Sequence, residues 1–517
     1  MTSSHLDVEL LAASAVLLVA VAGVRVGSRF GVPSLLLYMG IGMLLGEDVI
    51  GIHFDNAALA RDYGLVALAL IVAEGGLTTR WNDIRPVLPT AVALATVGVA
   101  VSIAVTAVAA HAALGFDWRH SALTGALVAS TDSAAVFSTL RHLPLPRRMV
   151  ALLEAESGLN DAPSVIAVTL LSSKHLNSVP DALGSLAYQL SVGAIVGGVF
   201  AVVGVAALRR GALPAVGLYP VATLAIALAS YAAAASIGAS GFLAVYLTTL
   251  ALGNAALPHR RATLGFADGI AWLAQIGLFV MLGLLSVPSR LPSAVAPALA
   301  IGAVLVVVAR PLSVLCCTPV GFRWPQRLFI SAGGLRGAVP IVLATIPITQ
   351  HVRGAARLFD VVVVLVTVLT IVQAPVLAPL AQRLHIVAPD LGRELSVEAA
   401  PLDQLAADLL TVHLGPRSRL HGVEIWELRL PETASVAFVV RDNRGFVPDR
   451  RTVLRHGDDM LVIASREVRP EVERRLRDVG RGGRLATFVT PTRTTPQSRR
   501  TALAALLLRA TPIRRRR

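Results

Sequence analysis

Charged residues are scarce in this chain of 517 residues, since only 15% are Asp, Glu, Lys or Arg and 55% are hydrophobic. Soluble domains carry about 25% charged residues, so this chain has too little polar surface to cover a water-soluble body of its length. The only two cysteines, Cys316 and Cys317, are adjacent in an apolar run, which excludes a disulfide framework. The same composition excludes a disordered or collagen-like chain. The sequence therefore predicts an integral membrane protein embedded in the lipid bilayer.

Lysine is nearly absent, because Lys174 is the only one and arginine supplies the rest of the basic charge. A net charge of +14 is typical of proteins that bind nucleic acids. Many of the arginines, however, lie in short loops between apolar runs, where they set membrane topology. We therefore expect no nucleic-acid partner. The phosphate loop of nucleotide hydrolases needs a lysine, so we expect no nucleotide hydrolysis. Met1–Leu10 has no Lys or Arg, so we expect no secretory signal.

Thirteen apolar runs approach the length of about 20 residues that a helix needs to cross a bilayer. They are Val8–Val24, Val32–Leu45, Tyr63–Leu77, Val87–Ala113, Ser121–Leu140, Met149–Leu171, Leu183–Leu208, Leu218–Ile237, Ala239–Ala256, Phe266–Val287, Ala294–Thr318, Leu328–Ile348 and Phe359–Leu380. The loops after odd-numbered runs hold fourteen basic residues, and those after even-numbered runs hold six. Since cytoplasmic loops carry the excess of basic residues, we predict a multi-pass plasma-membrane protein with its N-terminus outside and its C-terminus in the cytoplasm.

The composition changes after the last run and predicts four segments. These are a transmembrane domain at 1–387, a linker at 388–407, a small cytoplasmic α/β domain at 408–480 and a basic, disordered tail at 481–517. Within the α/β domain, Glu424–Leu430, Ser435–Arg441 and Met460–Ala464 indicate strands, and Asp442–Gly445 indicates a hairpin turn. The tail is either a solvated end or a segment that contacts anionic lipid.

An ionisable residue inside an apolar run costs about 2.5–3.5 kcal/mol on insertion scales and is a candidate functional group, and five such residues stand out. They are Glu74, Asp132, Glu156, Asp161 and Arg336. In the sixth run, helical spacing of four places Glu156 over Asn160, and Ser157 over Asp161. Such oxygen-bearing stripes suit a dehydrated cation. They also suit a proton, because burial favours the neutral form of a carboxylate, so proton and cation are expected to compete for Asp161.

Two of the runs contain segments that are poor helix formers. The fifth carries Ser130–Ser133, which is polar throughout, and the twelfth carries Gly333–Pro340, which is rich in glycine. Irregular backbone at membrane depth is tolerated where it is buried in protein or lines a cavity. If runs 1–6 and 8–13 are repeats joined by run 7, each break lies in the fifth run of its repeat. Because corresponding runs are seven crossings apart, the second repeat has the opposite orientation in the membrane. Interrupted helices at matching places of inverted repeats point to a transporter's substrate site.

Structural alternatives apply to several of these residues. For Glu156 and Arg336 we favour an ion pair between runs 6 and 12 over direct contact with a transported ion. Asp132 is either a helix cap or a ligand, and Glu74 either a ligand or a side chain that reaches towards water at a helix end. For Asp161 the sequence offers no further basic partner, which favours a functional role.

Three segments together resemble the signatures of the monovalent cation:proton antiporters of the NhaP type. They are Thr131–Phe137, Glu156–Asp161 and Gly334–Pro340. Two phrases, Glu74–Trp81 and Val339–Thr345, are more similar to the branch of potassium/proton antiporters called cell-volume-regulation proteins. The resemblance covers about Leu10 to Leu384.

The resemblance implies an all-α, NhaA-like antiporter fold with about 13 transmembrane helices, two inverted six-helix repeats and crossed interrupted helices. It implies a homodimer with a dimerisation domain and a core domain that moves like an elevator. It assigns the shared cation and proton carboxylate to Asp161, helped by a set of residues comprising Asp132, Ser157, Glu74 and the Thr131 carbonyl. Asn160 marks the generally electroneutral class, and Glu156 and Arg336 match the family's ion pair. Ser133 stands where many sodium-selective relatives have proline, which weakens a sodium assignment.

The C-terminal segment resembles the RCK C-terminal (TrkA-C) domain of potassium transport systems. The matching features are Gly422–Ile425, Pro448 after the hairpin and Gly457–Asp459. Such domains dimerise and in some relatives bind small nucleotides. Because no glycine-rich dinucleotide-binding unit precedes it, a nucleotide ligand and a purely structural dimer clasp stay open alternatives.

We therefore predict a secondary antiporter that exchanges cytoplasmic K+ for external H+ by alternating access, without a cofactor and without hydrolytic or redox chemistry. A role in cation, pH or cell-volume homeostasis follows from the resemblance. The alternatives are a Na+/H+ antiporter of the same family and a cation channel gated by the C-terminal domain. A membrane enzyme or receptor is disfavoured, because neither a zinc-ligand pair nor a serine–histidine set is evident in the sequence.

Overall fold

The computed structural model describes residues 3–30, 34–132, 145–173, 179–318, 321–386, 395–402, 407–415, 418–442, 444–465 and 467–483. The chain forms two compact units, Met1–Ala388 and Pro389–Arg517. Ser133, Lys174 and the basic tail from residue 484 onward lie outside the described residues. The expectations for these segments therefore stay predictions.

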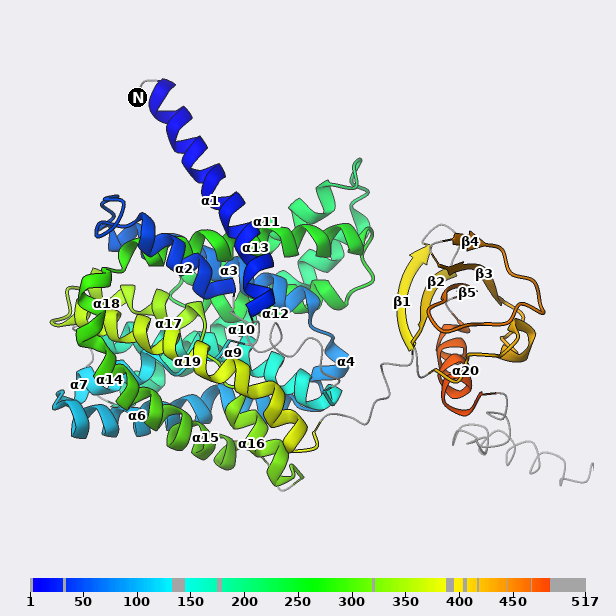
Figure 1. Cartoon of the computed structure of the whole chain (residues 1–517). Coiled ribbons are helices and arrows are strands. Elements are labelled where there is room, and N and C mark those ends of the chain that lie inside the picture. Colours follow the sequence, from blue (N-terminus) through cyan, green and yellow to red (C-terminus); the bar gives the residue numbers. More distant parts are fainter. Residues whose placement is uncertain are drawn as a thin grey trace, which may run out of the picture. The chain divides into compact units, whose positions relative to one another are not determined.

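The first unit is helical (Figure 1). Its first half contains α1 (Ser3–Phe30), α2 (Ser34–Leu45), α3 (Ala57–Thr78), α4 (Trp81–Ile84), α5 (Leu88–Ala93), the π-helical turn η1 (Leu94–Gly98), α6 (Val99–Leu114), α7 (Trp118–Leu127), α9 (Arg147–Ser172) and α10 (Val179–Arg210). Its second half contains α11 (Leu218–Ser236), α12 (Gly241–Asn254), α13 (Arg260–Leu285), the 3-10 turn η2 (Pro288–Arg290), α14 (Leu291–Val304), the π-helical turn η3 (Leu305–Ala309), α15 (Arg310–Cys317), α16 (Trp324–Ala332), α17 (Ala338–Leu343), α18 (Thr345–Thr349) and α19 (Ala355–Arg383).

Helix lies at each of the apolar runs that the sequence indicates. The predicted boundary at Gly238 is confirmed, because α11 ends at Ser236 and Gly238 takes a left-handed conformation with φ 69° before α12 begins. Within the described residues, six helical segments are long and apolar enough to cross a membrane by themselves. Other apolar helices, α2 and α12 among them, are shorter. The count of thirteen crossings and the inverted repeats therefore stay predictions.

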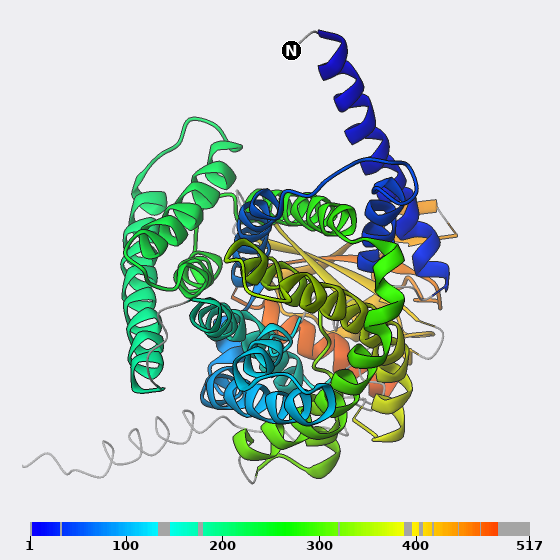
Figure 2. The same cartoon turned by 90° about the vertical axis from the view of Figure 1, so that its left-hand side faces the viewer.

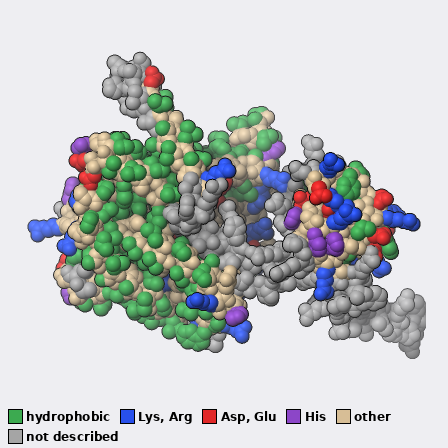
Figure 3. All heavy atoms as spheres, in the orientation of Figure 1, with side chains coloured by type: hydrophobic (Ala, Val, Ile, Leu, Met, Phe, Trp, Pro, Cys, Tyr) green, Lys and Arg blue, Asp and Glu red, His purple; other side chains and the backbone are tan. Residues whose placement is uncertain are grey.

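Hydrophobic side chains cover most of the visible face of this helical unit (Figure 3). A helical body with an apolar exterior is expected where lipid replaces water as the solvent. Inside, small residues allow close helix contacts. A Cβ atom at Gly42 of α2 would lie 2.0 Å from the Val280 carbonyl oxygen of α13, and one at Gly283 would lie 2.2 Å from the Met39 carbonyl oxygen. Elsewhere, α10 and α11 pack together at one edge of the unit (Figure 2).

The two poor helix-forming segments are breaks in the structure and they contact each other. One break follows Leu127 at the end of α7, and the other separates α16 from α17. The Asp132 backbone N–H donates to the Leu335 carbonyl oxygen at 2.8 Å, which joins the two breaks directly. Backbone groups that a continuous helix would have satisfied thus find partners within the protein, as the membrane interior requires.

The second unit is a small α/β domain with a five-stranded sheet in the order β1-β2-β5-β3-β4. Its elements are β1 (Leu395–Leu402), β2 (Ala407–Leu414), the 3-10 turn η4 (Ile425–Leu428), β3 (Ala434–Arg441), β4 (Arg444–Phe446), β5 (Asp459–Ser465) and α20 (Arg469–Gly482). Every pairing is antiparallel. Val472, Leu476 and Val479 of α20 recur at helical spacing and join the core with alternate residues of β2 and β5.

Most of the local predictions for this unit agree with its structure. The predicted strands at Ser435–Arg441 and Met460–Ala464 coincide with β3 and β5, and the hairpin connects β3 to β4. The predicted strand at Glu424–Leu430 is wrong, because η4 occupies that range. There, a Glu427 carboxylate oxygen accepts the Glu424 N–H at 2.8 Å, and this local hydrogen bond competes with strand pairing. In addition, β1 lies within the range 388–407 that the sequence indicates as a linker.

Candidate cation and proton site

Asp161 lies at the centre of a buried polar cluster between α9 and the break that follows α7. Asp161 is only 6% exposed, and the Ser130 hydroxyl donates to its Oδ1 at 2.5 Å. Ser130 is itself fully buried. Because α9 continues as a helix past Asp161 while α7 has already ended, the irregular backbone can approach the α9 carboxylate closely.

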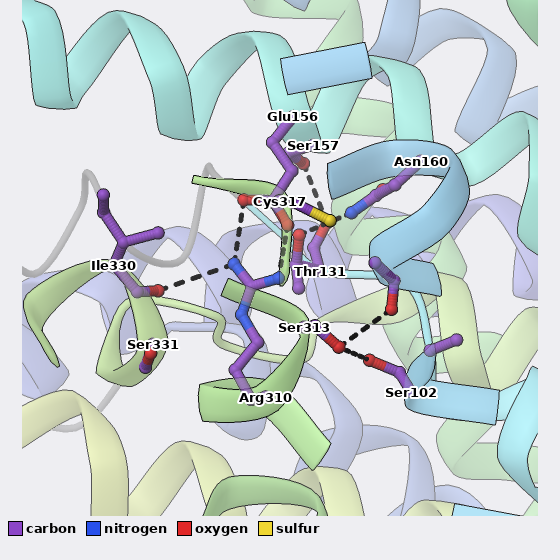
Figure 4. Close-up of polar contacts among 12 residues, drawn as sticks. Ser102, Thr131, Glu156, Ser157, Asn160, Arg310, Ser313, Cys317, Ile330 and Ser331 are labelled. Atoms are coloured by element: carbon purple, nitrogen blue, oxygen red, sulfur yellow. Dashed lines mark hydrogen bonds and ion pairs between the residues drawn. The ribbon is translucent and has the colours of Figure 1, made fainter. Parts of the chain in front are cut away.

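Thr131 connects two more α9 side chains to the same break (Figure 4). The Ser157 hydroxyl donates to the Thr131 carbonyl oxygen at 2.8 Å, and the Asn160 amide donates to the Thr131 hydroxyl at 2.6 Å. All three residues are buried. The two stripes that helical spacing predicts on α9 therefore meet a single short segment of the chain.

Asp132 lies where the two breaks cross. Its carboxylate faces Gly337 so closely that a Cβ atom at Gly337 would lie 1.7 Å from Oδ2, so only glycine fits at this position. Asp132 also interacts electrostatically with Asp161. Two carboxylates, hydroxyl groups and a main-chain carbonyl thus gather in one buried region. Hard cations prefer such oxygen ligands, and a carboxylate in the same place can take up a proton instead.

Glu74 occupies a different place. It is a half-buried residue of α3 and lines a cavity with α11 and α13, where Thr223 and Thr263 supply the other hydroxyl groups. It interacts electrostatically with Asp268 of α13. The membership of Glu74 in the Asp161 cluster therefore stays a prediction from the family resemblance.

The prediction that Glu156 forms an ion pair with Arg336 is wrong. Arg310 at the start of α15 pairs with Glu156 instead, with Nη1 and Nη2 at 2.5 and 2.8 Å from the two carboxylate oxygens (Figure 4). All three side chains are buried. The sequence could not identify the partner, because α15 reaches α9 only through tertiary packing.

Arg336 instead stabilises the crossing of the breaks. Its Nη1 donates to the Ala129 carbonyl oxygen at 2.9 Å and to the Ser130 carbonyl oxygen at 2.6 Å. Thr370 of α19 donates in turn to the Arg336 carbonyl oxygen at 3.2 Å. A positive charge is thereby placed against carbonyl groups beyond the end of α7, which is the negative end of that helix dipole.

Sequence reasoning missed three residues of this region: Ser130 as the donor to Asp161, Arg310 as the partner of Glu156, and Glu154. Ser130 lies within the polar stretch of the fifth run, so its neighbours gave the signal. Glu154 lies in the sixth run, seven residues before Asp161, a spacing that places both on one helical face. Arg310 is a charged residue inside the eleventh run, which is a signal in itself, but the sequence does not indicate which carboxylate it pairs with.

Known proteins match both units of the chain. A family profile described as "sodium/hydrogen exchanger, transmembrane" matches residues 15–383, and the TrkA-C domain profile matches residues 409–477. The chain is 35% identical over 482 residues to "K(+)/H(+) antiporter NhaP" of Alkalimonas amylolytica, covering 90% of this chain and 83% of that protein. It is 36% identical over 470 residues to "K(+)/H(+) antiporter NhaP2" of Shewanella sp. strain ANA-3, covering 88% and 80%.

A more distant relative and a solved structure extend these matches. The chain is 27% identical over 299 residues to "Na(+)/H(+) antiporter NhaS2" of Synechocystis sp., covering 54% of this chain and 53% of that protein. The structure of the sodium proton antiporter MjNhaP1 from Methanocaldococcus jannaschii at pH 8 superposes with a TM-score of 0.64 at 20% identity. That superposition covers 73% of this chain and 99% of the other and shows a shared fold.

Proposed function

Because the chain belongs to the sodium/hydrogen exchanger family, we propose that it is a secondary antiporter that exchanges cytoplasmic K+ for external H+. Cation/proton antiport is the activity that the family match and the relatives support. The preference for K+ rests on the names of two relatives at 35% and 36% identity. The observation that carries the proposal is the buried Asp161 carboxylate, which accepts a hydrogen bond from Ser130 in the irregular backbone of a helix break.

The chemistry of the cluster supports a competition between cation and proton. In its charged form, Asp161 can bind a dehydrated cation together with Asp132, Ser157 and the Thr131 carbonyl oxygen. A proton on the same carboxylate removes the charge that holds the cation, so the cation leaves. One proton therefore replaces one monovalent cation. Asn160 is a neutral amide that donates to Thr131 and adds no titratable group next to Asp161 on α9, which favours electroneutral exchange.

Two sets of matching features support inverted repeats and alternating access. Runs 4 and 11 each contain a π-helical turn, η1 and η3, and runs 5 and 12 each contain a break. Ser102 and Ser313 lie four residues after their π-helical turns and their hydroxyl groups contact each other at 2.9 Å (Figure 4). A contact between corresponding residues is expected on a pseudo-two-fold axis. Rocking or sliding of one part against the other would expose Asp161 to one side at a time.

We assign the transporter to the plasma membrane with the N-terminus outside, as the distribution of basic loops indicates. The proposed domains are 1–387 for transport, 388–407 as a connection whose β1 pairs with the sheet of the second unit, 408–480 as the cytoplasmic TrkA-C domain and 481–517 as the tail. A homodimer is proposed from the family resemblance. The TrkA-C domain then serves either as a nucleotide-binding regulator or as a dimer clasp. The chain is thus a transporter in this assignment, with K+ or Na+ and H+ as cargo.

Na+/H+ exchange is the second candidate, favoured by the match to the Synechocystis antiporter. The deciding experiment measures dissipation of a pH gradient in proteoliposomes with K+, Na+, Li+ and Rb+ in parallel, with and without a clamped membrane potential. Exchange with K+ and Rb+ that is insensitive to the clamp is the expected result. Preference for Na+ and Li+ would support the second candidate, and currents without cation-dependent proton movement would contradict antiport.

A further inference from the structure

Glu154 is another acidic residue of α9, and it has no role in the exchange at Asp161. Seven residues separate the two positions, which is almost two full helical turns, so they lie on one stripe about 10 Å apart along the axis. Glu156 points away from this stripe, to Arg310. Glu154 therefore lies nearer the N-terminal end of α9, on the side that the basic loops predict to be cytoplasmic.

Among the described residues, no side chain of opposite charge contacts the Glu154 carboxylate. Within the part of the chain that the structure describes, its half-buried carboxylate makes neither a hydrogen bond nor an ion pair. It interacts electrostatically with Asp83 and Glu74, which repel it, and with Arg80, which attracts it. Half-buried carboxylates that repel one another are costly unless a cation joins them.

Tyr246 of α12 adds an independent observation. The residue is 2% exposed; among the described residues its hydroxyl group makes no hydrogen bond of regular geometry, and Thr79 is the side chain that interacts with it. A Cβ atom at Gly158 would lie 2.8 Å from Cζ, the ring carbon that carries this hydroxyl. Gly158 is one turn beyond Glu154 on the same helix, and Tyr246 interacts electrostatically with Glu154. The buried oxygen therefore lies between the levels of Glu154 and Asp161.

We propose that Glu154, with Glu74 and the Tyr246 hydroxyl, forms an outer binding site that the transported monovalent cation occupies between the cytoplasm and Asp161. The site rests on the proposed function, since it uses the same cargo. Carboxylate and hydroxyl oxygens are the ligands that such cations prefer. The positive charge of Arg80 offsets part of the acidic charge, which keeps binding weak enough for the cation to move on.

The test uses the full chain in everted membrane vesicles, where added K+ meets the face that is cytoplasmic in the cell. Glu154→Gln keeps the shape of the side chain but removes its charge, and it should raise the KM for K+ about tenfold. The maximal rate at saturating K+ should stay near that of the wild type. Glu154→Asp should lie between the two. Glu47→Gln removes an equivalent but exposed charge from the loop between α2 and α3 and should leave the KM unchanged.

Tyr246→Phe provides a second variant, because it removes only the buried hydroxyl. It should raise the KM for K+ about threefold, and it tests the site even if Glu154→Gln does not reach the membrane. An unchanged KM in both variants would overturn the outer site, as would a fall in the maximal rate with the KM unchanged. These outcomes leave Asp161 untouched, whereas exchange that persists in Asp161→Asn would overturn the proposed exchange mechanism and not the outer site.

Discussion

Arg310 holds both carboxylate oxygens of Glu156, although the two residues are 154 positions apart in the sequence. Arg310 also lies against the second break, because a Cβ atom at Gly334 would lie 2.6 Å from its Nε. One guanidinium group therefore ties α9 to the segment between α16 and α17. Asp161 lies on the same helix α9, so this ion pair helps to position the cluster without belonging to it.

Loss of Asp161 should abolish exchange. Asp161→Asn retains a side chain of similar size that can still accept from Ser130 but cannot carry the charge that binds a cation. Cation-dependent dissipation of a pH gradient in everted vesicles should fall to the level of vesicles without the protein. Elution as a folded species in size-exclusion chromatography should be unchanged. Normal exchange in this variant would contradict the role assigned to Asp161.

Loss of Arg310 should destabilise the helical unit. Arg310→Ala leaves the buried Glu156 charge uncompensated, which costs about 3–5 kcal/mol, and should lower the folded yield and the unfolding temperature in detergent. The exchanged pair Glu156→Arg/Arg310→Glu should recover part of the loss. The corresponding exchange with Arg336 should not, since Arg336 bonds to carbonyl groups. Equal recovery in the two double variants would argue against the observed pairing.

The Thr131 side chain should contribute to the stability of the first break through its hydroxyl group. Thr131→Val removes the acceptor of the Asn160 amide and leaves that buried amide unsatisfied, at a cost of about 1–3 kcal/mol. Thr131→Ser keeps the acceptor and is the matched control. Thermal unfolding of the purified chain should separate the two variants. Identical unfolding temperatures would show that the hydrogen bond contributes nothing measurable.

The TrkA-C domain contains a buried ion pair of its own. Asp458 is fully buried and accepts from Arg441 at 2.7 and 2.8 Å. The hydrogen bonds that Arg441 donates to Asp458 raise the pKa of Arg441, which keeps the guanidinium charged throughout the physiological range. Arg441→Ala should therefore destabilise this domain by about 3–5 kcal/mol at neutral pH, seen as faster proteolysis of the C-terminal unit in the full chain.

The more exposed pair of Arg477 and Glu473 on α20 serves as the control for that measurement. Surface pairs at this helical spacing contribute about 0.3–0.5 kcal/mol, so Arg477→Ala should leave the rate of proteolysis almost unchanged. Similar sensitivity in the two variants would mean that burial of Asp458 does not set the energy of its ion pair.

The positions of the helices and of both breaks could be predicted because they depend on local properties. Apolar length, glycine content and the polar stretch at Ser130–Ser133 act within one segment of chain. Helical spacing on α9 likewise places Asp161, Asn160 and Ser157 towards one partner, and the structure supplies Thr131 and Ser130 as that partner. Where a local hydrogen bond opposes the general pattern, as at Glu424–Leu430, the prediction fails.

The sequence by itself therefore determined a helical membrane protein with two interrupted segments, a carboxylate at Asp161 and a separate α/β domain. Only the tertiary structure decided that Arg310 pairs with Glu156, that Arg336 bonds to the carbonyl groups beyond α7, and that Glu74 lines a cavity with α11 and α13. The physical reason is that periodicity fixes which side of a helix a residue occupies. The helix that packs against that side is chosen by contacts between segments far apart in the chain.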